Sequence, residues 1–275
     1  MAPTKRPVFF ISDGTGITAE MLGHSLLTQF DNIEFTQSVI PFIDTVDKAR
    51  QCLEQLSQAH ASAGVRPLVF ATLVNTEIRN ILHEADCLFL DFFERFLGPL
   101  EAELGARSSH TIGRSHGAVG NKGYQDRIEA VNFALAHDDG MSIRELDRAD
   151  VILVGVSRSG KTPTSLYLAL QFGIKAANYP LIPEDFARNE LPSGLRERSA
   201  KLYGLSIAAD RLSEIRNERR PGSKYADLDN CRYEVAAAEQ LMRRYGVPWM
   251  NSTTRSIEEI ATKILQDIKL ERRGF

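Results

Sequence analysis

Short apolar stretches that alternate with turns and helical patterns are the feature that most constrains the fold of this chain. The first stretch, residues 8–12, ends at a glycine turn, and apolar side chains then recur over residues 17–30 at the three-to-four spacing of a helix face. Further strands are expected at 35–42, 68–74 and 87–91, with helical segments between them. Nearly unbroken apolar strands separated by helices are typical of a parallel sheet that helices cover. We therefore expect an N-terminal α/β domain with a parallel sheet.

The character of the sequence changes near residue 105. A polar, glycine-rich connector with little periodicity follows, and helical spacing returns over residues 124–137. A new strand is expected at 151–154, another at 246–250, and an amphipathic helix at 257–270. We place the boundary so that residues 1–104 form the N-terminal domain and residues 105–275 a second α/β domain, in which 105–144 is a connector that contains a candidate catalytic segment.

Composition excludes several classes of protein. Thirty-three Lys and Arg against thirty-six Asp and Glu give a formal net charge of -3, so the chain has no global basic field for nucleic acid or anionic lipid. No run approaches the ~18 apolar residues of a membrane span, and the first apolar stretch is shorter than the ~7 to 15 residues of a signal-peptide core. The three cysteines form no C-x-x-C pair, which fits a reducing compartment. We expect a cytoplasmic protein that binds neither nucleic acid nor membrane.

The motif G-x-x-x-x-G-K-[ST] follows the apolar strand at 151–154 and precedes a helical stretch. Its residues are Gly155, Val156, Ser157, Arg158, Ser159, Gly160, Lys161 and Thr162. Glycines let successive N–H groups turn toward a phosphate, Lys161 neutralises phosphate oxygens, and the Thr162 hydroxyl is suited to hold Mg²⁺. The motif predicts a phosphate or nucleotide site in a P-loop kinase-like α/β domain.

An acidic group must complete such a site, and the common P-loop patterns do not supply one. The guanine-reading N-K-x-D has its nearest match at Asn121-Lys122, where Tyr124 stands in place of the Asp. No clear apolar strand ending in Asp follows the loop to orient Mg²⁺. Asp138 and Asp139, just before the strand that leads into the loop, are therefore candidates for a general base or a metal ligand. A polar helix terminus is an equal alternative for this pair.

Three other patterns allow a functional and a structural interpretation. Residues 12–18 form a second glycine turn between strand and helix that could bind a phosphate or carboxylate, although a purely structural turn is favoured. Arg158 is either an additional contact to a transferring phosphoryl group or a solvated loop residue. The basic run at 211–220 is interpreted as a solvated helix face, with a docking surface for an acidic partner as the lesser alternative. Its arginines are Arg211, Arg216, Arg219 and Arg220.

The ordered motifs of this chain resemble the kinase-pyrophosphorylase family of bacteria and plastids, which includes the regulators of pyruvate, phosphate dikinase. The segments that carry the resemblance are 10–15, 66–70, 136–140, 155–165, 176–181 and 251–253. They span essentially the whole chain, and the extended loop G-x-S-R-x-G-K-T-P-x-S is far more specific than a bare phosphate loop. The resemblance implies a bifunctional enzyme, which uses ADP to phosphorylate and inactivate a target at a threonine and uses inorganic phosphate to reverse this, releasing pyrophosphate.

The resemblance also implies roles and partners. The loop residues would hold the β-phosphate of ADP in one direction and inorganic phosphate in the other, with Lys161 catalytic and Mg²⁺ as the expected metal. Phosphoenolpyruvate synthase is the expected protein substrate and pyruvate, phosphate dikinase the alternative. An ATP-dependent P-loop kinase of a small molecule and a nucleotide-sensing adaptor are the competing classes. The oligomeric state stays open, with a homodimer as one option.

Overall fold

The computed structural model describes residues 5–109, 121–138 and 145–270, with the backbone alone for 121–124. The chain divides into two compact units, residues 1–118 and 119–275. Each unit contains a four-stranded parallel sheet covered by helices, which confirms the expected α/β fold class. The division lies beyond the boundary expected after residue 104, and the expected connector includes helix α6 (Asn121–Ala136).

The sheet of the first unit has the strand order β2-β1-β3-β4, and every neighbouring pair is parallel. Its strands are β1 (Arg6–Ser12), β2 (Phe35–Ile40), β3 (Leu68–Thr72) and β4 (Leu88–Asp91). Helices α2 (Val46–Ala63) and α3 (Thr76–Leu82) pack on one face, α1 (Ile17–Leu27) lies on the other, and α4 (Phe92–Leu104) follows β4. Side chains of β1 alternate between the two faces, so Phe10 packs with the α1 side and Ile11 with the α2 side.

The sheet of the second unit has the order β6-β5-β7-β8 and is likewise parallel. Its strands are β5 (Val151–Gly155), β6 (Ala176–Pro180), β7 (Leu202–Ser206) and β8 (Trp249–Asn251). Around it lie α6, α7 (Lys161–Phe172), α8 (Pro183–Arg188), α9 (Ser193–Arg196), α10 (Ala209–Arg219), α11 (Leu228–Arg244) and α12 (Ile257–Ile268), with single 3-10 turns η2 (Leu146–Arg148), η3 (Ser199–Lys201) and η4 (Lys224–Ala226). Helices α7 and α12 bury one face of the sheet, and α8, α10 and α11 bury the other.

Both units have the same connectivity, since in each the first strand lies between the second and the third. The strand order therefore reverses beside β1 in one unit and beside β5 in the other. Ligands of open parallel sheets bind at the carboxyl ends of the strands at such a reversal. In each unit a glycine turn leaves the first strand at this place, residues 12–16 after β1 and residues 155–162 after β5.

None of the helices that the structure describes combines the length and the apolar character needed to cross a membrane.

Candidate phosphate-binding site

Residues 155–162, called the 155–162 loop below, connect β5 to α7 through a sharply bent backbone. Three of its residues have positive φ angles: Gly155 at 150°, Arg158 at 75° and Gly160 at 89°. A side chain at Gly155 would overlap the carbonyl of Leu205 on β7, so only glycine allows the strand to end here. Arg158 adopts the left-handed region at a cost of roughly 1 kcal/mol. A bend of this kind is the backbone conformation in which successive N–H groups can turn toward a phosphate.

The loop encloses a small cavity at the N-terminus of α7. The cavity has a volume of about 190 Å³ and is lined by Ser157, Arg158, Gly160, Lys161, Thr162 and Pro163. Pockets that enclose a whole small-molecule ligand measure roughly 300 to 1,000 Å³, so this one is suited to phosphate groups rather than to a complete nucleotide. No side chain caps α7 at Gly160, and the first turn has no acidic residue. An uncapped helix N-terminus of this kind favours a bound anion.

Contacts from within the loop and from a neighbouring strand hold it in place. Lys161 is 4% exposed, and its Nζ donates to the carbonyl of Val156 on the opposite side of the loop, 2.8 Å away. Ser252, just after β8, has its Oγ 3.0 Å from the carbonyl of Ser159 and 3.0 Å from that of Ser206. Since one hydroxyl carries one hydrogen, Ser252 can donate to either carbonyl in turn. The contact of Lys161 with Val156 places its ammonium group beside the cavity, which Lys161 also lines.

Asp138 and Asn178 meet the end of the loop at Thr162. The Thr162 hydroxyl donates to Asp138 Oδ1 at 2.8 Å, and Asn178 Nδ2 lies 2.5 Å from the same oxygen and 2.9 Å from the Thr162 Oγ1. Asp138 follows the C-terminal end of α6, where the carbonyl of His137 accepts the backbone N–H of Asn178 on β6 at 3.0 Å. The structure thus brings Asp138 to the predicted loop, whereas Asp139 lies outside the described residues.

The hydrogen bonds from Thr162 and Asn178 fall on the same carboxylate oxygen of Asp138. Both hydrogen bonds above end on Oδ1, and no described residue donates to Oδ2. A carboxylate beside a threonine hydroxyl also suits Mg²⁺, which binds through one or two such oxygens together with substrate phosphates and water. Among the described residues, no three or more His, Cys, Asp or Glu side chains are grouped so that they could hold a metal ion by themselves.

The structure corrects the expectation that residues 211–220 form a solvated face. Arg216 is fully buried, and its Nη2 donates to Glu234 Oε2 at 2.7 Å. Arg216 lies four residues after buried Leu212, on the side of α10 that packs against α11, and Glu234 of α11 supplies the neutralising charge. The remaining arginines of the run are exposed, namely Arg211, Arg219 and Arg220.

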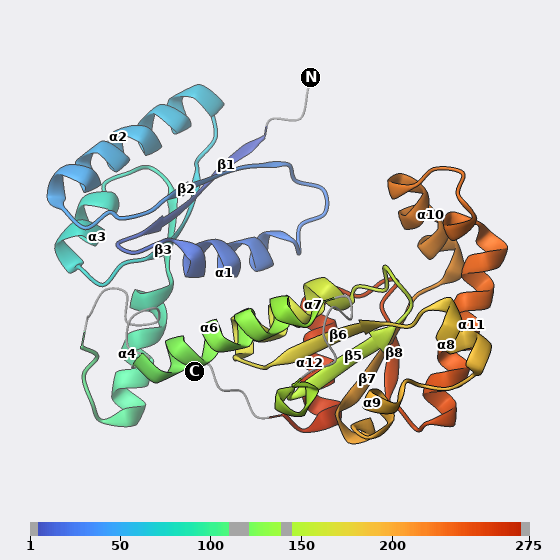
Figure 1. The fold of residues 1–275 in the computed structure, drawn as a ribbon. Coiled ribbons are helices and arrows are strands. Elements are labelled where there is room, and N and C mark those ends of the chain that lie inside the picture. Colours follow the sequence, from blue (N-terminus) through green and yellow to red (C-terminus); the bar gives the residue numbers. More distant parts are fainter. Residues whose placement is uncertain (1–4, 110–120, 139–144, 271–275) are drawn as a thin grey trace. The chain divides into compact units, whose positions relative to one another are not determined.

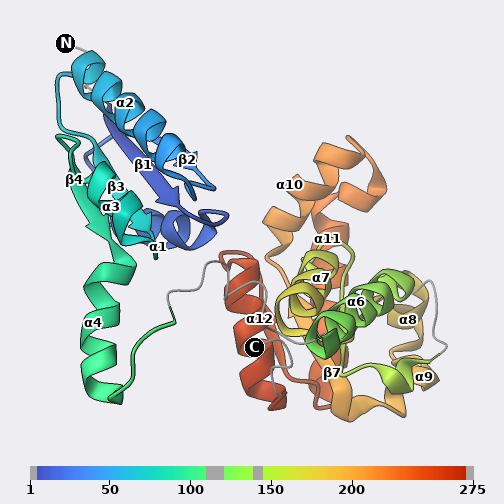
Figure 2. The same ribbon diagram turned by 90° about the vertical axis from the view of Figure 1, so that its left-hand side faces the viewer.

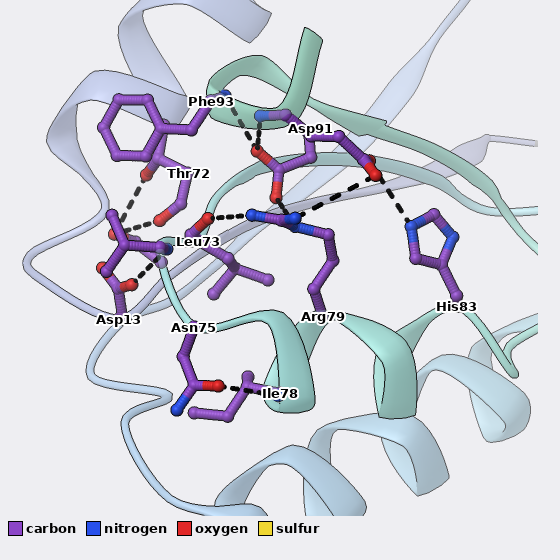
Figure 3. Close-up of polar contacts among 12 residues, drawn as sticks. Asp13, Thr72, Leu73, Asn75, Ile78, Arg79, His83, Asp91 and Phe93 are labelled. Carbon is purple, nitrogen blue, oxygen red and sulfur yellow. Dashed lines mark hydrogen bonds and ion pairs between the residues drawn. The ribbon is translucent and has the colours of Figure 1, made fainter. Parts of the chain in front are cut away.

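The turn after β1 uses its polar groups internally (Figure 3). The Ser12 hydroxyl oxygen accepts the Gly14 N–H at 3.0 Å, and Asp13 Oδ2 accepts the Val74 N–H at 2.7 Å. Nearby, Arg79 Nε donates to Asp91 Oδ2 at 3.1 Å. Burial raises the pKa values of both carboxyl groups above their ordinary range. Two carboxylates beside one arginine disfavour an anion, which supports a structural role for this turn.

The parallel sheets and the 155–162 loop together define an α/β protein with a P-loop motif at the reversal of strand order. Residues 8–265 match the model of the family described as kinase/pyrophosphorylase, and the chain belongs to this family. Membership supports a kinase-type phosphotransferase activity.

Several curated proteins are similar to the chain over nearly its whole length. The protein of Azoarcus sp. (strain BH72) is 63% identical over 271 residues, which cover 98% of each chain. That of Herminiimonas arsenicoxydans is 61% identical over 271 residues, or 98% of this chain and 96% of the relative. That of Ralstonia nicotianae is 59% identical over 273 residues, or 99% and 98%. Each of the three bears the name "Putative phosphoenolpyruvate synthase regulatory protein".

The sequence pattern placed none of Asn178, Tyr225 and Arg216 at the site, although all three contact residues of the loop. Asn178 lies in one of the segments that carry the family resemblance, and this position is the only signal that pointed to it. Tyr225 and Arg216 lie beyond α9 and reach the loop only through the packing of α10 and η4.

Proposed function

We propose that this protein is a bifunctional regulator of phosphoenolpyruvate synthase. It transfers the β-phosphoryl group of ADP to a threonine of the synthase, which inactivates the synthase, and it removes that group with inorganic phosphate, releasing pyrophosphate. The observation that carries the proposal is the contact of Asp138 with Thr162 at an uncapped helix N-terminus. Family membership and the names of the relatives support the choice of reaction and target.

In the kinase direction, the N–H groups of the loop and the Lys161 ammonium bind the β-phosphate of ADP. The threonine oxygen of the target attacks the β-phosphorus while Asp138 Oδ2 accepts the hydroxyl proton. The bond between the β-phosphorus and the bridging oxygen breaks, and AMP leaves. Mg²⁺, when bound at the Thr162 hydroxyl, would neutralise phosphate oxygens.

In the phosphorylase direction, inorganic phosphate occupies the same loop. Its oxygen attacks the phosphorus of the phosphothreonine, and the bond from that phosphorus to the threonine oxygen breaks. Asp138 returns the proton to the threonine oxygen, and the product is pyrophosphate. One loop and one carboxyl group therefore serve both directions, because each direction needs an anion cradle and a proton carrier beside the threonine oxygen.

The decisive experiment incubates the protein with phosphoenolpyruvate synthase that bears its phosphohistidine, with ADP or with ATP. Mass spectrometry reads phosphorylation of the synthase threonine, and phosphate is then added while pyrophosphate is measured. Transfer from ADP and reversal by phosphate are expected. Transfer from ATP alone would instead indicate an ordinary kinase, and transfer to pyruvate, phosphate dikinase but not to the synthase would show that the target is wrong.

A further inference from the structure

Ser157 of the 155–162 loop is held at two points by a distant part of the chain. Tyr225 of η4 has its hydroxyl 3.0 Å from Ser157 Oγ, and Arg216 of α10 donates from Nη2 to the Ser157 carbonyl at 3.2 Å. These residues follow Ser157 by 68 and 59 positions. Ser157 also lines the cavity of the loop. A segment that is remote in sequence thus reaches the wall of the phosphate cavity.

Arg216 fixes the Tyr225 ring as well as the loop. Its guanidinium lies over that ring, 4.0 Å from the centroid, and its Nη1 donates to the Tyr225 carbonyl at 2.9 Å. The planar guanidinium is suited to combine stacking with several directed hydrogen bonds. A buried ion pair such as Arg216 with Glu234 is weak evidence for a gain in stability, because desolvation offsets the attraction. The contacts of Arg216 with Ser157 and Tyr225 connect this pair to the loop.

The chemistry of phosphate sets the direction of hydrogen bonding in the chain of two hydroxyls. A phosphate dianion offers acceptors only, whereas each hydroxyl carries one hydrogen and two lone pairs. Ser157 lines the cavity and Tyr225 is not among its lining residues, so both hydrogens are used when Tyr225 donates to Ser157 and Ser157 donates to phosphate. Among the described residues, no acceptor takes the Ser157 hydrogen. Successive hydrogen bonds of this kind polarise and strengthen one another.

We propose that Ser157 donates its hydroxyl hydrogen to a phosphate oxygen in the loop, and that Tyr225, held by Arg216, is the positioning residue that directs this hydrogen. The inference rests on the proposed function only in requiring that the loop binds phosphate groups. It assigns the segment from α10 to η4 to the nucleotide site. A protein that binds ADP but phosphorylates no synthase would leave this inference intact.

The test is a double-mutant cycle on the full chain, with ADP and inorganic phosphate binding measured by calorimetry. Tyr225→Phe keeps the ring and its contact with Arg216 and removes only the hydroxyl. Ser157→Ala should weaken ADP binding roughly tenfold, as expected for a lost hydrogen bond to a charged group. Tyr225→Phe should weaken it roughly threefold, and the double variant should bind no more weakly than Ser157→Ala. Ser157→Thr, which keeps a hydroxyl, should restore most of the affinity.

Tyr233→Phe is the matched control, because Tyr233 is 57% exposed on α11 and its hydroxyl has no part in the network. Thermal unfolding of each variant separates loss of the hydrogen bond from loss of structure. Unchanged ADP affinity in Tyr225→Phe beside a weakened Ser157→Ala would overturn the positioning role, as would additive losses in the double variant. Failure of the unchanged protein to bind either ADP or phosphate would overturn both this inference and the proposed function.

Discussion

The Thr162 hydroxyl lies 2.8 Å from Asp138 Oδ1, although 24 positions separate the two residues in the chain. Helix α6 packs along α7, and its C-terminal end delivers Asp138 to the first turn of α7. The pairing of β6 with β5 places Asn178 against the same oxygen. A carboxylate therefore reaches the 155–162 loop from the end of helix α6, which precedes β5, instead of from the end of a neighbouring strand.

Asp138→Asn should separate binding from catalysis. The amide oxygen can still accept hydrogen bonds from Thr162 and Asn178, but the side chain no longer accepts a proton. Loss of the proposed general base predicts a fall in turnover by a factor of about 100 or more, with ADP affinity changed far less. The rate of threonine phosphorylation and a calorimetric titration with ADP check this. Asp147→Asn, at an exposed ion pair with Arg198, is the control, and equal turnover in the two variants would return Asp138 to a structural role.

Lys161→Ala should abolish both directions of the proposed reaction, because each would place a phosphate group beside the same ammonium. The kinase and phosphorylase rates are measured separately on synthase and on phosphorylated synthase. Inorganic phosphate should also inhibit the kinase direction competitively with ADP. A variant that keeps the full phosphorylase rate, or noncompetitive inhibition, would contradict the shared site.

Gly155→Ala should disrupt the loop more than an ordinary glycine substitution does. The added methyl group would overlap the Leu205 carbonyl, which is backbone and has no freedom to turn away. We expect a loss of stability of about 2 kcal/mol or more together with loss of ADP binding. Gly194→Ala in α9 is the comparison, since its methyl group would meet only the Arg198 Nη1 at 3.8 Å. Urea unfolding followed by Trp249 fluorescence suits both variants, and equal midpoints would count against the steric argument.

The two buried carboxylates of the first unit should respond differently to neutralisation. Burial raises the pKa of Asp13, so its charged form is penalised at pH 7 and the penalty fades as the pH falls through the raised value. Asp13→Asn should therefore stabilise the first unit at pH 7, by a margin that shrinks toward pH 4. Burial raises the pKa of Asp91 as well, but Asp91→Asn leaves buried Arg79 without its close ion-pair partner and should cost about 3 kcal/mol.

Hydrogen exchange of the amides in β1 and β3 measures both Asp variants, because the single tryptophan, Trp249, belongs to the other unit. Equal effects of Asp13→Asn and Asp91→Asn at pH 7 would show that the ion pair to Arg79 does not distinguish these two carboxylates.

The sequence was most informative where local pattern alone decides the structure. Strand β5 and the loop after it were predicted because an unbroken apolar run meets a fixed spacing of glycines and lysine. Strands β6 and β7 were not predicted, because Asn178, Pro180 and Gly204 interrupt the apolar pattern. The presence of such residues within a strand is explained by packing, which the sequence pattern does not show. Gly204, for example, leaves room for Met242 and Trp249, which a side chain there would overlap.

The candidate site shows the same division between local and long-range information. Asp138 was a candidate, together with Asp139, because of its order in the chain relative to the loop, and its contact with Thr162 places it there. Asn178 was given no role, since its contact with Thr162 depends on the pairing of β6 with β5. The buried position of Arg216 was mispredicted because its partner Glu234 lies on another helix, and the local alternation of Arg and Glu resembles that of an exposed surface.

The contacts that hold the 155–162 loop have a thermodynamic consequence. Lys161 spans it, Ser252 fastens Ser159, and Arg216 with Tyr225 fastens Ser157. A cradle that is shaped before its ligand arrives costs little ordering entropy on binding, so its affinity for a small anion is not consumed by rearrangement. If ADP and inorganic phosphate share such a preorganised cradle, their relative concentrations set the direction of the reaction, and the protein responds to the ratio of ADP to phosphate.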